Sequence, residues 1–333
     1  MNAKKTQTIE LPQTYSDFRS YLEQSLRNPF ILDLSDADLK TVIQSCIATK
    51  SKLNPKYGAS MSSLVTAIEY IEKLYRITLV PKQVTDIFWT YFVGLLQQKG
   101  LKNSTISTLA NQLRAVLRWG TRYNVEISPS FDMLRIPANK SFQIALSEDE
   151  VSQIYHFDVQ LFYRDKRPQY RKRMEQVRDM FTLSCNLYQR HSDMVRIDRT
   201  CFNRNIFRIT QLKTGSIAIV DIDKMSVNPK ATYAILEKYG YNAPYIGDLS
   251  NYNSYLHELM KDVGLCDDIR IEERVNGEIE TTIRKKYEMI ASHTARRTAI
   301  SIAYFRNKST HDIRKCSGHQ SLDMLEKYIK ERD

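Results

Sequence analysis

The chain has 333 residues, 42% of them apolar, with a formal net charge of +11. This composition excludes a disordered chain and is typical of a folded protein long enough for two domains. The positive charge favours a polyanionic partner, nucleic acid before a membrane surface. Five scattered cysteines without a C-x-x-C pair exclude a disulfide framework and a zinc site of the usual spacing.

No apolar run approaches ~20 residues, and the N-terminal stretch MNAKKTQTIELPQ lacks an apolar signal segment. We therefore expect a cytoplasmic protein without a membrane partner. The chain contains neither G-x-G-x-x-G nor G-x-x-x-x-G-K-[ST], the two glycine-rich motifs that cradle nucleotide phosphates. Any phosphate would be bound by side chains, and we expect no cofactor and no metal.

Apolar residues at helical spacing predict helices in the first part of the chain at 14–27, 36–50, 60–76, 84–98 and 103–123. Prolines and a polar run within 128–146 then predict an interdomain linker, which we place at 139–146. We expect 55–138 to be an all-α domain. Residues 1–54 are either a helical extension or the first part of that domain.

The second part, 147–333, shows a mixed pattern and predicts an α+β domain. β-Branched stretches around a central Lys-Thr-Gly turn predict a hairpin within 201–222, and a second hairpin is predicted at 269–284 with its turn at Asn276–Gly277. The basic stretch RDKRPQYRKR at 164–173 is predicted to be a loop. Helices are predicted at 147–162, 174–189, 229–239, 250–263, 293–304, 309–316 and 321–330.

Positive charge is concentrated in 87–125, which has five basic residues and no acidic one. On the helix predicted there, an apolar stripe runs opposite three arginines spaced four residues apart. Without a carboxylate among them, these arginines are expected to follow a phosphate backbone rather than form intrahelical ion pairs. The candidate DNA-binding residues are Lys99, Lys102, Arg114, Arg118 and Arg122, with Arg171, Lys172 and Arg173 from the second basic stretch.

Residue types suited to phosphate chemistry recur along the second part of the chain. Each taken singly is more often a solvated or core side chain than a catalytic one. His293 and Arg296 share one face of a predicted helix, and Lys213 lies in the predicted hairpin turn. The candidate catalytic residues are Arg190, Lys213, His293, Arg296, His319 and the nucleophile Tyr328, with Asp193 as a supporting carboxylate.

The order Arg, Lys, His-x-x-Arg, Gly-His and, nine residues later, Tyr resembles the tyrosine recombinases, the phage integrase family. The stretches that carry it are LSCNLYQRHSDMVRI, FRITQLKTGSIAIVDI, SHTARRTAIS and CSGHQSLDMLEKYIK. KKYEMIASHTARRT is especially similar to integrases of mobile elements in Bacteroidetes. The resemblance is strong over 145–330, weaker over 55–138 and slight over 1–54. It implies an all-α, SAM-like core-binding domain followed by a mixed α+β catalytic domain.

The resemblance implies a reaction in which Tyr328 attacks a DNA phosphate and forms a 3′-phosphotyrosyl enzyme. Arg190 and Arg296 would donate to the non-bridging oxygens, because guanidinium groups stay protonated. His293 would accept the phenol proton, and Lys213 would protonate the leaving 5′-oxygen. In the same scheme His319 hydrogen-bonds the phosphate and Asp193 orients Arg190.

The sequence departs from the family pattern at four positions. Tyr188 and Gln189 replace a common Gly-Leu, Arg297 replaces a frequent second histidine, and Ser317 replaces an apolar residue. We expect none of the four to contact the catalytic groups. The chain ends five residues after Tyr328, so we expect assembly through another surface or through a tail beyond this sequence.

The implied function is site-specific DNA recombination, integrating or excising a mobile element of a bacterium or phage. The chain would be a monomer in solution and a homotetramer on two double-stranded DNA sites, each subunit clamping DNA between its domains, with accessory DNA-bending factors as further partners. Three alternatives remain open. They are a type IB topoisomerase or telomere resolvase, a catalytically silent DNA-binding regulator, and a metallohydrolase using His293, His311 and His319.

Overall fold

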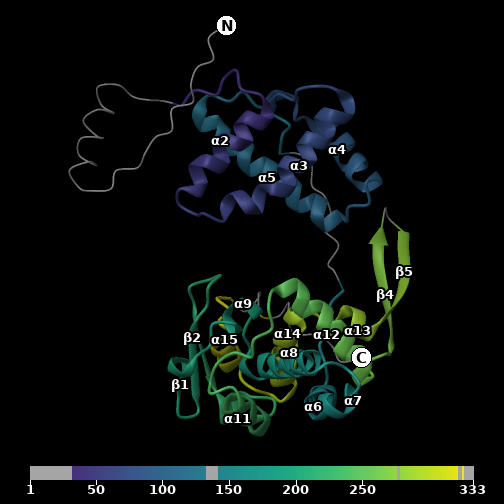
Figure 1. The fold of residues 1–333 in the computed structure, drawn as a ribbon. Helices are drawn as coiled ribbons and strands as arrows, with labels where there is room; N and C mark the ends of the chain where they lie inside the picture. The colour runs from purple at the N-terminus through teal and green to yellow at the C-terminus, as the bar shows by residue number, and fades with distance from the viewer. Residues whose placement is uncertain (1–31, 133–141, 276–277, 322–324, 326–333) are drawn as a thin grey trace, which may run out of the picture. The chain divides into compact units, whose positions relative to one another are not determined.

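The computed structural model describes residues 32–132, 142–275, 278–321 and Leu325 (Figure 1). The chain divides into two units, Met1–Lys140 and Ser141–Asp333, and each has its own apolar core. The helix predicted at 14–27, and all of 321–330 except Ser321 and Leu325, lie outside the described residues. Among the described helices, none has both the length and the apolar character needed to cross a bilayer.

Unit 1 is helical throughout its described residues. Side-chain caps fix where its helices begin: Asp38 accepts from the amide of Thr41 at 2.7 Å, and Thr85 accepts from the amide of Phe88 at 3.2 Å. Its elements are α2 (Leu39–Ser51), α3 (Tyr57–Tyr75), η1 (Pro81–Gln83), α4 (Asp86–Gln98), α5 (Asn103–Gly120) and η2 (Thr121–Tyr123).

Helix α5 supplies the centre of the unit 1 core. The predicted apolar stripe of α5 is confirmed, since all its members are buried: Ile106, Leu109, Leu113, Val116 and Leu117. They pack with α2 and α3, and apolar residues between 34 and 46 belong to the same core. The described part of 1–54 thus contributes side chains to the core of this helical unit.

Unit 2 combines helices with two small antiparallel sheets. Its helices are α6 (Glu148–His156), α7 (Val159–Phe162), α8 (Pro168–Leu187), α9 (His191–Met194), η3 (Arg199–Cys201), α10 (Ile222–Met225), α11 (Pro229–Lys238), α12 (Leu249–Val263), α13 (Lys286–Met289), α14 (Ser292–Phe305) and α15 (Thr310–Ser317). Its strands are β1 (Phe202–Asn203), β2 (Ile206–Thr210), β3 (Ile217–Asp221), β4 (Asp268–Val275) and β5 (Glu278–Lys285).

Helix α8 is the central element of unit 2, and it packs against α6, α11, α12 and α14 (Figure 1). The prediction of a loop over 164–173 is wrong from Pro168 onward, because α8 begins there. At the first helical position the backbone N–H has no acceptor within the helix, so a proline there loses no hydrogen bond, and its fixed φ suits the helix. Part of the predicted linker is also core: Ile144 and Leu146 are buried in unit 2, and the Leu146 amide donates to Thr298 Oγ1 at 2.9 Å.

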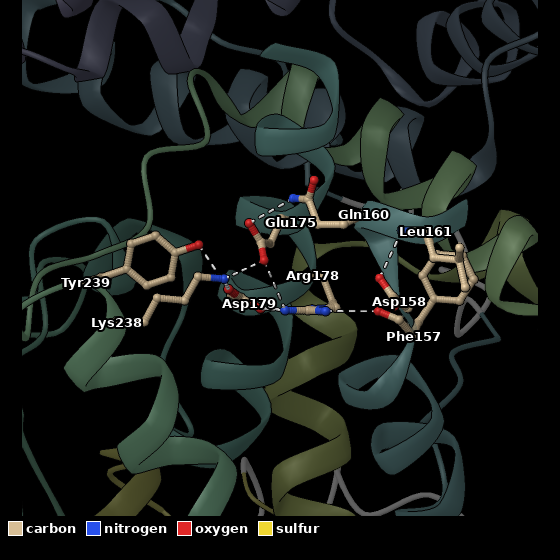
Figure 2. Close-up of polar contacts among 9 residues, drawn as sticks. All are labelled: Phe157, Asp158, Gln160, Leu161, Glu175, Arg178, Asp179, Lys238 and Tyr239. Atoms are coloured by element: carbon tan, nitrogen blue, oxygen red, sulfur yellow. Dashed lines mark hydrogen bonds and ion pairs between the residues drawn. The ribbon is translucent and has the colours of Figure 1, made fainter. Parts of the chain in front are cut away.

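A buried carboxylate ties α8 to α11 (Figure 2). Asp179 is fully buried, and it accepts from Arg178 Nη2 at 2.7 Å, Lys238 Nζ at 2.7 Å and Tyr239 Oη at 2.9 Å. Lys238 also lies 2.8 Å from Glu175. Because a buried charge is tolerated only when it is paired and hydrogen-bonded, this cluster depends on every partner being present.

The first sheet ends in the predicted Lys-Thr-Gly turn. Strands β2 and β3 pair from Ile206–Asp221 to Thr210–Ile217, which leaves 211–216 as the connecting tip, and β1 adds to the free edge of β2. Helix α15 packs against β3. The second sheet is the β4–β5 hairpin, and its predicted turn at Asn276–Gly277 lies outside the described residues.

Candidate active site

Five of the predicted catalytic side chains come from four separate segments of unit 2. Arg190 directly precedes α9, Lys213 lies in the β2–β3 tip, and His293 and Arg296 lie in the first turns of α14. His319 follows the end of α15. Tyr328, the predicted nucleophile, lies outside the described residues.

Arg296 is fully buried and joins two of these segments. Its Nη1 donates to the Tyr188 carbonyl at 2.8 Å, and its Nη2 donates to the Ser317 carbonyl at 2.6 Å. Nη2 also lies 3.1 Å from His319 Nε2. These bonds hold the end of α8 and the end of α15 on a single guanidinium, so Arg296 organises the site as well as supplying charge.

The contacts of His319 decide its tautomer. Arg296 can only donate, so His319 Nε2 must accept and the ring proton lies on Nδ1, 2.9 Å from Ser317 Oγ. Burial, followed by the charges of Arg296 and Arg190, lowers the pKa of His319 to about 3, which keeps the ring neutral. Both ring nitrogens are engaged in the protein. In this arrangement His319 accepts from Arg296, and the hydrogen bond to a phosphate expected of it stays a prediction.

Arg190 is held by an amide that the sequence did not single out. Its Nη1 donates to Gln211 Oε1 at 2.9 Å, and Gln211 is buried. Gln211 is the residue that leaves β2, two positions before Lys213. The half-buried Arg190 and the hairpin tip are thus connected through one side chain.

The expected role of Asp193 in orienting Arg190 stays a prediction, and the contacts of its carboxylate are with the hairpin tip and with Arg196. Asp193 is fully buried, and it accepts from the backbone amide of Leu212 at 2.8 Å while pairing with Arg196 at 3.5 Å. Its carboxylate therefore anchors the hairpin tip next to Lys213. Lys213 itself is exposed, as a cation that reaches toward a ligand must be.

His293 is the point at which the cations of the site come together. Burial lowers the pKa of His293 to about 4, and the charges of Arg297, Arg296, Arg190 and Lys213 act in the same direction. An imidazole with this pKa is neutral at neutral pH. The side chain therefore has the protonation state that a general base requires.

The depressed pKa of His293 predicts an acid-dependent loss of stability. The folded pKa lies below the unfolded value of 6.5, so between pH 6.5 and about 4 the unfolded chain binds the extra proton. The free energy of unfolding should then fall by about 1 kcal/mol per pH unit as the pH decreases through this window. His293→Gln should lack this contribution. Urea denaturation followed by circular dichroism, from pH 4.5 to 7.5, measures both proteins, and identical pH slopes would contradict the assignment.

Two of the four departures from the family pattern contact predicted catalytic side chains, contrary to expectation, and a third, Gln189, is linked to Arg190 through Gln211. The Tyr188 carbonyl accepts from Arg296, Gln189 Oε1 accepts from Gln211 Nε2 at 2.8 Å, and Ser317 Oγ lies against His319. Tyr188 has a φ of +63°, the left-handed conformation that glycine adopts at little cost. Its buried ring and the 2.7 Å bond from its hydroxyl to the Met225 carbonyl hold it there.

The arginines predicted to follow DNA differ in exposure. Arg114 is buried, 5.1 Å from the Trp89 ring, and pairs with Asp132 at 3.4 Å, so its placement on the exposed face is wrong. Arg118 also pairs with Asp132. Asp132 is held next to α5 because the preceding residue, Phe131, accepts a hydrogen bond at its carbonyl from Trp89 Nε1 at 3.0 Å. The candidates in unit 1 that remain exposed are Lys99, Lys102, Arg118 and Arg122.

In the second basic stretch, two arginines use their donors within the protein. Arg171 Nη1 donates to the carbonyls of Arg164 and Lys166, and Arg173 Nη1 donates to the Tyr245 carbonyl at 3.3 Å. Lys172 is exposed. Within the described residues, no three histidine, cysteine or carboxylate side chains lie close enough together to hold a metal ion. The metallohydrolase alternative therefore has no ligand set among the described residues.

No protein-family model and no curated protein matches the chain. Solved structures do match. A lambda integrase tetramer bound to a Holliday junction has a TM-score of 0.63 at 14% identity, covering 95% of this chain and 85% of that one. A lambda integrase dimer bound to a COC′ core site has a TM-score of 0.59 at 18% identity, covering 87% and 95%.

The integrase of transposon Tn1549, in complex with a circular intermediate DNA, has a TM-score of 0.62 at 11% identity, covering 89% of this chain and 96% of that one. At such identities the likeness concerns the fold alone. The chain has the fold of the lambda and Tn1549 integrases.

Proposed function

We propose that this chain is a tyrosine recombinase, an enzyme that breaks and rejoins DNA strands at specific sites. One observation carries the proposal: a neutral His293 surrounded by the charges of Arg190, Lys213, Arg296 and Arg297. A cluster of cations around one uncharged base suits an anionic substrate that must be attacked by a deprotonated nucleophile. The fold, shared with DNA-bound integrases, agrees with it.

In the proposed reaction the phenol of Tyr328 loses its proton to His293, and its oxygen attacks a DNA phosphorus. A bond forms between the Tyr328 oxygen and phosphorus, while the bond from phosphorus to the 5′-oxygen breaks. Lys213 gives a proton to that leaving oxygen, which ends as a 5′-hydroxyl. The 3′-phosphotyrosyl bond keeps the phosphodiester energy, so a second 5′-hydroxyl can reverse the step without ATP.

The two arginines have different proposed tasks. Arg190, half-buried and held on one side by Gln211, would donate to a non-bridging oxygen. Arg296 is fully buried, with its Nη atoms bonded to protein carbonyls, so it would act mainly through its fixed positive charge. Preorganised donors and charges of this kind contribute roughly 10²–10³ in rate each in comparable sites.

We further propose that the substrate is double-stranded DNA at two recombination sites of a mobile element, with four copies of the chain assembled on them. The neighbours that support this are integrases, one crystallised as a tetramer on a Holliday junction. Exposed basic side chains of both units are the proposed phosphate contacts: Lys99, Lys102, Arg118, Arg122 and Lys172.

The test is covalent capture. The chain is incubated with short nicked duplexes of random sequence, denatured with detergent, and the DNA-linked protein is digested and mapped by mass spectrometry. We expect the linked peptide to contain Tyr328, with DNA attached through a 3′-phosphate. DNA binding without any covalent product would support the silent regulator instead. Relaxation of a supercoiled plasmid of arbitrary sequence would support the topoisomerase.

A further inference from the structure

Two buried glutamines lie at the centre of the site described above, and neither belongs to the set of charged catalytic residues. Gln189 and Gln211 are 0% and 1% exposed. Gln211 Nε2 donates to Gln189 Oε1 and to the Ser317 carbonyl, each at 2.8 Å. Its Oε1 accepts from Arg190 Nη1 at 2.9 Å and from Thr214 Oγ1 at 3.2 Å. The amide thus uses both donors and both lone pairs.

The orientation of the Gln211 amide is fixed by its surroundings. Gln189 Nε2 donates to the carbonyls of Leu187 and Cys316, at 2.6 and 2.9 Å, so only its oxygen is left to face Gln211. A rotated Gln211 amide would place its oxygen against two acceptors. It would also place its NH₂ group against the guanidinium, which only donates. One rotamer state therefore satisfies the whole group.

Gln211 is also attached to the tip that carries Lys213. Its backbone amide donates to the Ser216 carbonyl at 2.9 Å, and its carbonyl accepts from the Gly215 amide at 2.9 Å, which closes the turn. The fit is tight, because a Cβ on Gly318 would lie 2.7 Å from the Gln211 side chain. The Ser317 carbonyl that accepts from Gln211 accepts from Arg296 as well, at 2.6 Å.

We propose that Gln211, oriented by Gln189, is a positioning residue that fixes the direction of the Arg190 guanidinium and aligns it with the Lys213 tip and Arg296. This role rests on the proposed strand-cleavage function. A guanidinium aimed within a few tenths of an ångström is needed for a phosphate contact, and a displacement of about 1 Å can cost roughly 10²-fold in rate. DNA affinity, spread over many phosphate contacts, should change little.

The test uses Gln211→Met, which keeps length and removes every hydrogen bond of the amide. Single-turnover adduct formation on a nicked duplex, selected by the capture experiment, should slow by roughly 10- to 100-fold, with DNA affinity near that of the unmodified chain. The matched control is Gln153→Met, which removes an amide bonded to the Val263 carbonyl at 2.8 Å. That variant should cleave at the normal rate.

A double-mutant cycle separates positioning from a general loss of structure. In an Arg190→Ala background, Gln211→Met should not lower the rate of adduct formation further, because the guanidinium that Gln211 positions is absent. Equal losses in both backgrounds would overturn the proposal, and so would a normal rate for Gln211→Met alone. Should Gln211→Met not fold, Gln189→Met replaces it in the same cycle, with a smaller loss of the same kind expected. An unmodified chain that forms no adduct would instead overturn the proposed function.

Discussion

Tyr328→Phe is expected to bind DNA as the unmodified chain does and to lose covalent adduct formation by roughly 10⁴-fold or more. The substitution removes one oxygen, which is the atom proposed to bond to phosphorus, and leaves the ring in place. Binding is measured by fluorescence anisotropy on the captured duplex. Adduct is measured as the detergent-resistant DNA-linked species over time.

The matched control is Tyr304→Phe. Tyr304 lies in α14, on the same helix as the candidate base, and is 43% exposed. Loss of its hydroxyl should leave both binding and adduct formation unchanged. Adduct formed by Tyr328→Phe at the normal rate would assign the nucleophile to another residue, even if the fold and the DNA affinity were as expected.

Asp179→Ala is expected to destabilise unit 2 by about 1–3 kcal/mol, because three partly exposed donors lose the buried carboxylate that they share. Arg178, Lys238 and Tyr239 all donate to Asp179 (Figure 2). The loss should appear in circular dichroism or tyrosine fluorescence during urea denaturation. An unchanged midpoint would contradict this account of the cluster.

The two units can be followed separately in that experiment. Both tryptophans of the chain, Trp89 and Trp119, lie in unit 1. Tryptophan fluorescence should therefore report a transition that Asp179→Ala leaves in place. As a surface control, Asp165→Ala removes an exposed carboxylate 3.9 Å from Arg164, and such a change is worth within about 0.5 kcal/mol.

Local patterns in the sequence predicted much of the fold. The stripe on α5 and the Lys-Thr-Gly tip follow from the periods of helix and strand, which depend only on neighbours in the chain. Arg114 shows that such local patterns do not predict contacts made by tertiary structure. Its partner Asp132 lies beyond the acid-free window 87–125, and tertiary contacts at Trp89 and Phe131 bring it back. Pro168 is a local signal for the first residue of a helix, but the many basic residues around it favoured the prediction of a loop.

The charged candidates of the site were predictable because their order resembles a known pattern, whereas their supports were not. Gln189 and Gln211 carry no charge and stand 22 positions apart, so nothing in the sequence pairs them. The hydrogen bond that the Leu212 amide donates to Asp193 depends on how α9 meets the hairpin. The family resemblance placed Asp193 beside Arg190, and nothing in the sequence indicates that its carboxylate also accepts from a backbone amide of the hairpin.

The Ser317 carbonyl accepts from Arg296 and from Gln211, and through Gln211 it is linked to Arg190. No replacement of a side chain deletes a main-chain oxygen. Systematic alanine scanning would therefore leave the Ser317 carbonyl oxygen in place, although Arg296 donates to it directly and Arg190 is linked to it through Gln211. An alanine at position 317 would show only the effect of losing the Ser317 hydroxyl. An ester in place of the following peptide link, which weakens the carbonyl oxygen as an acceptor, is the chemical change that would reach it.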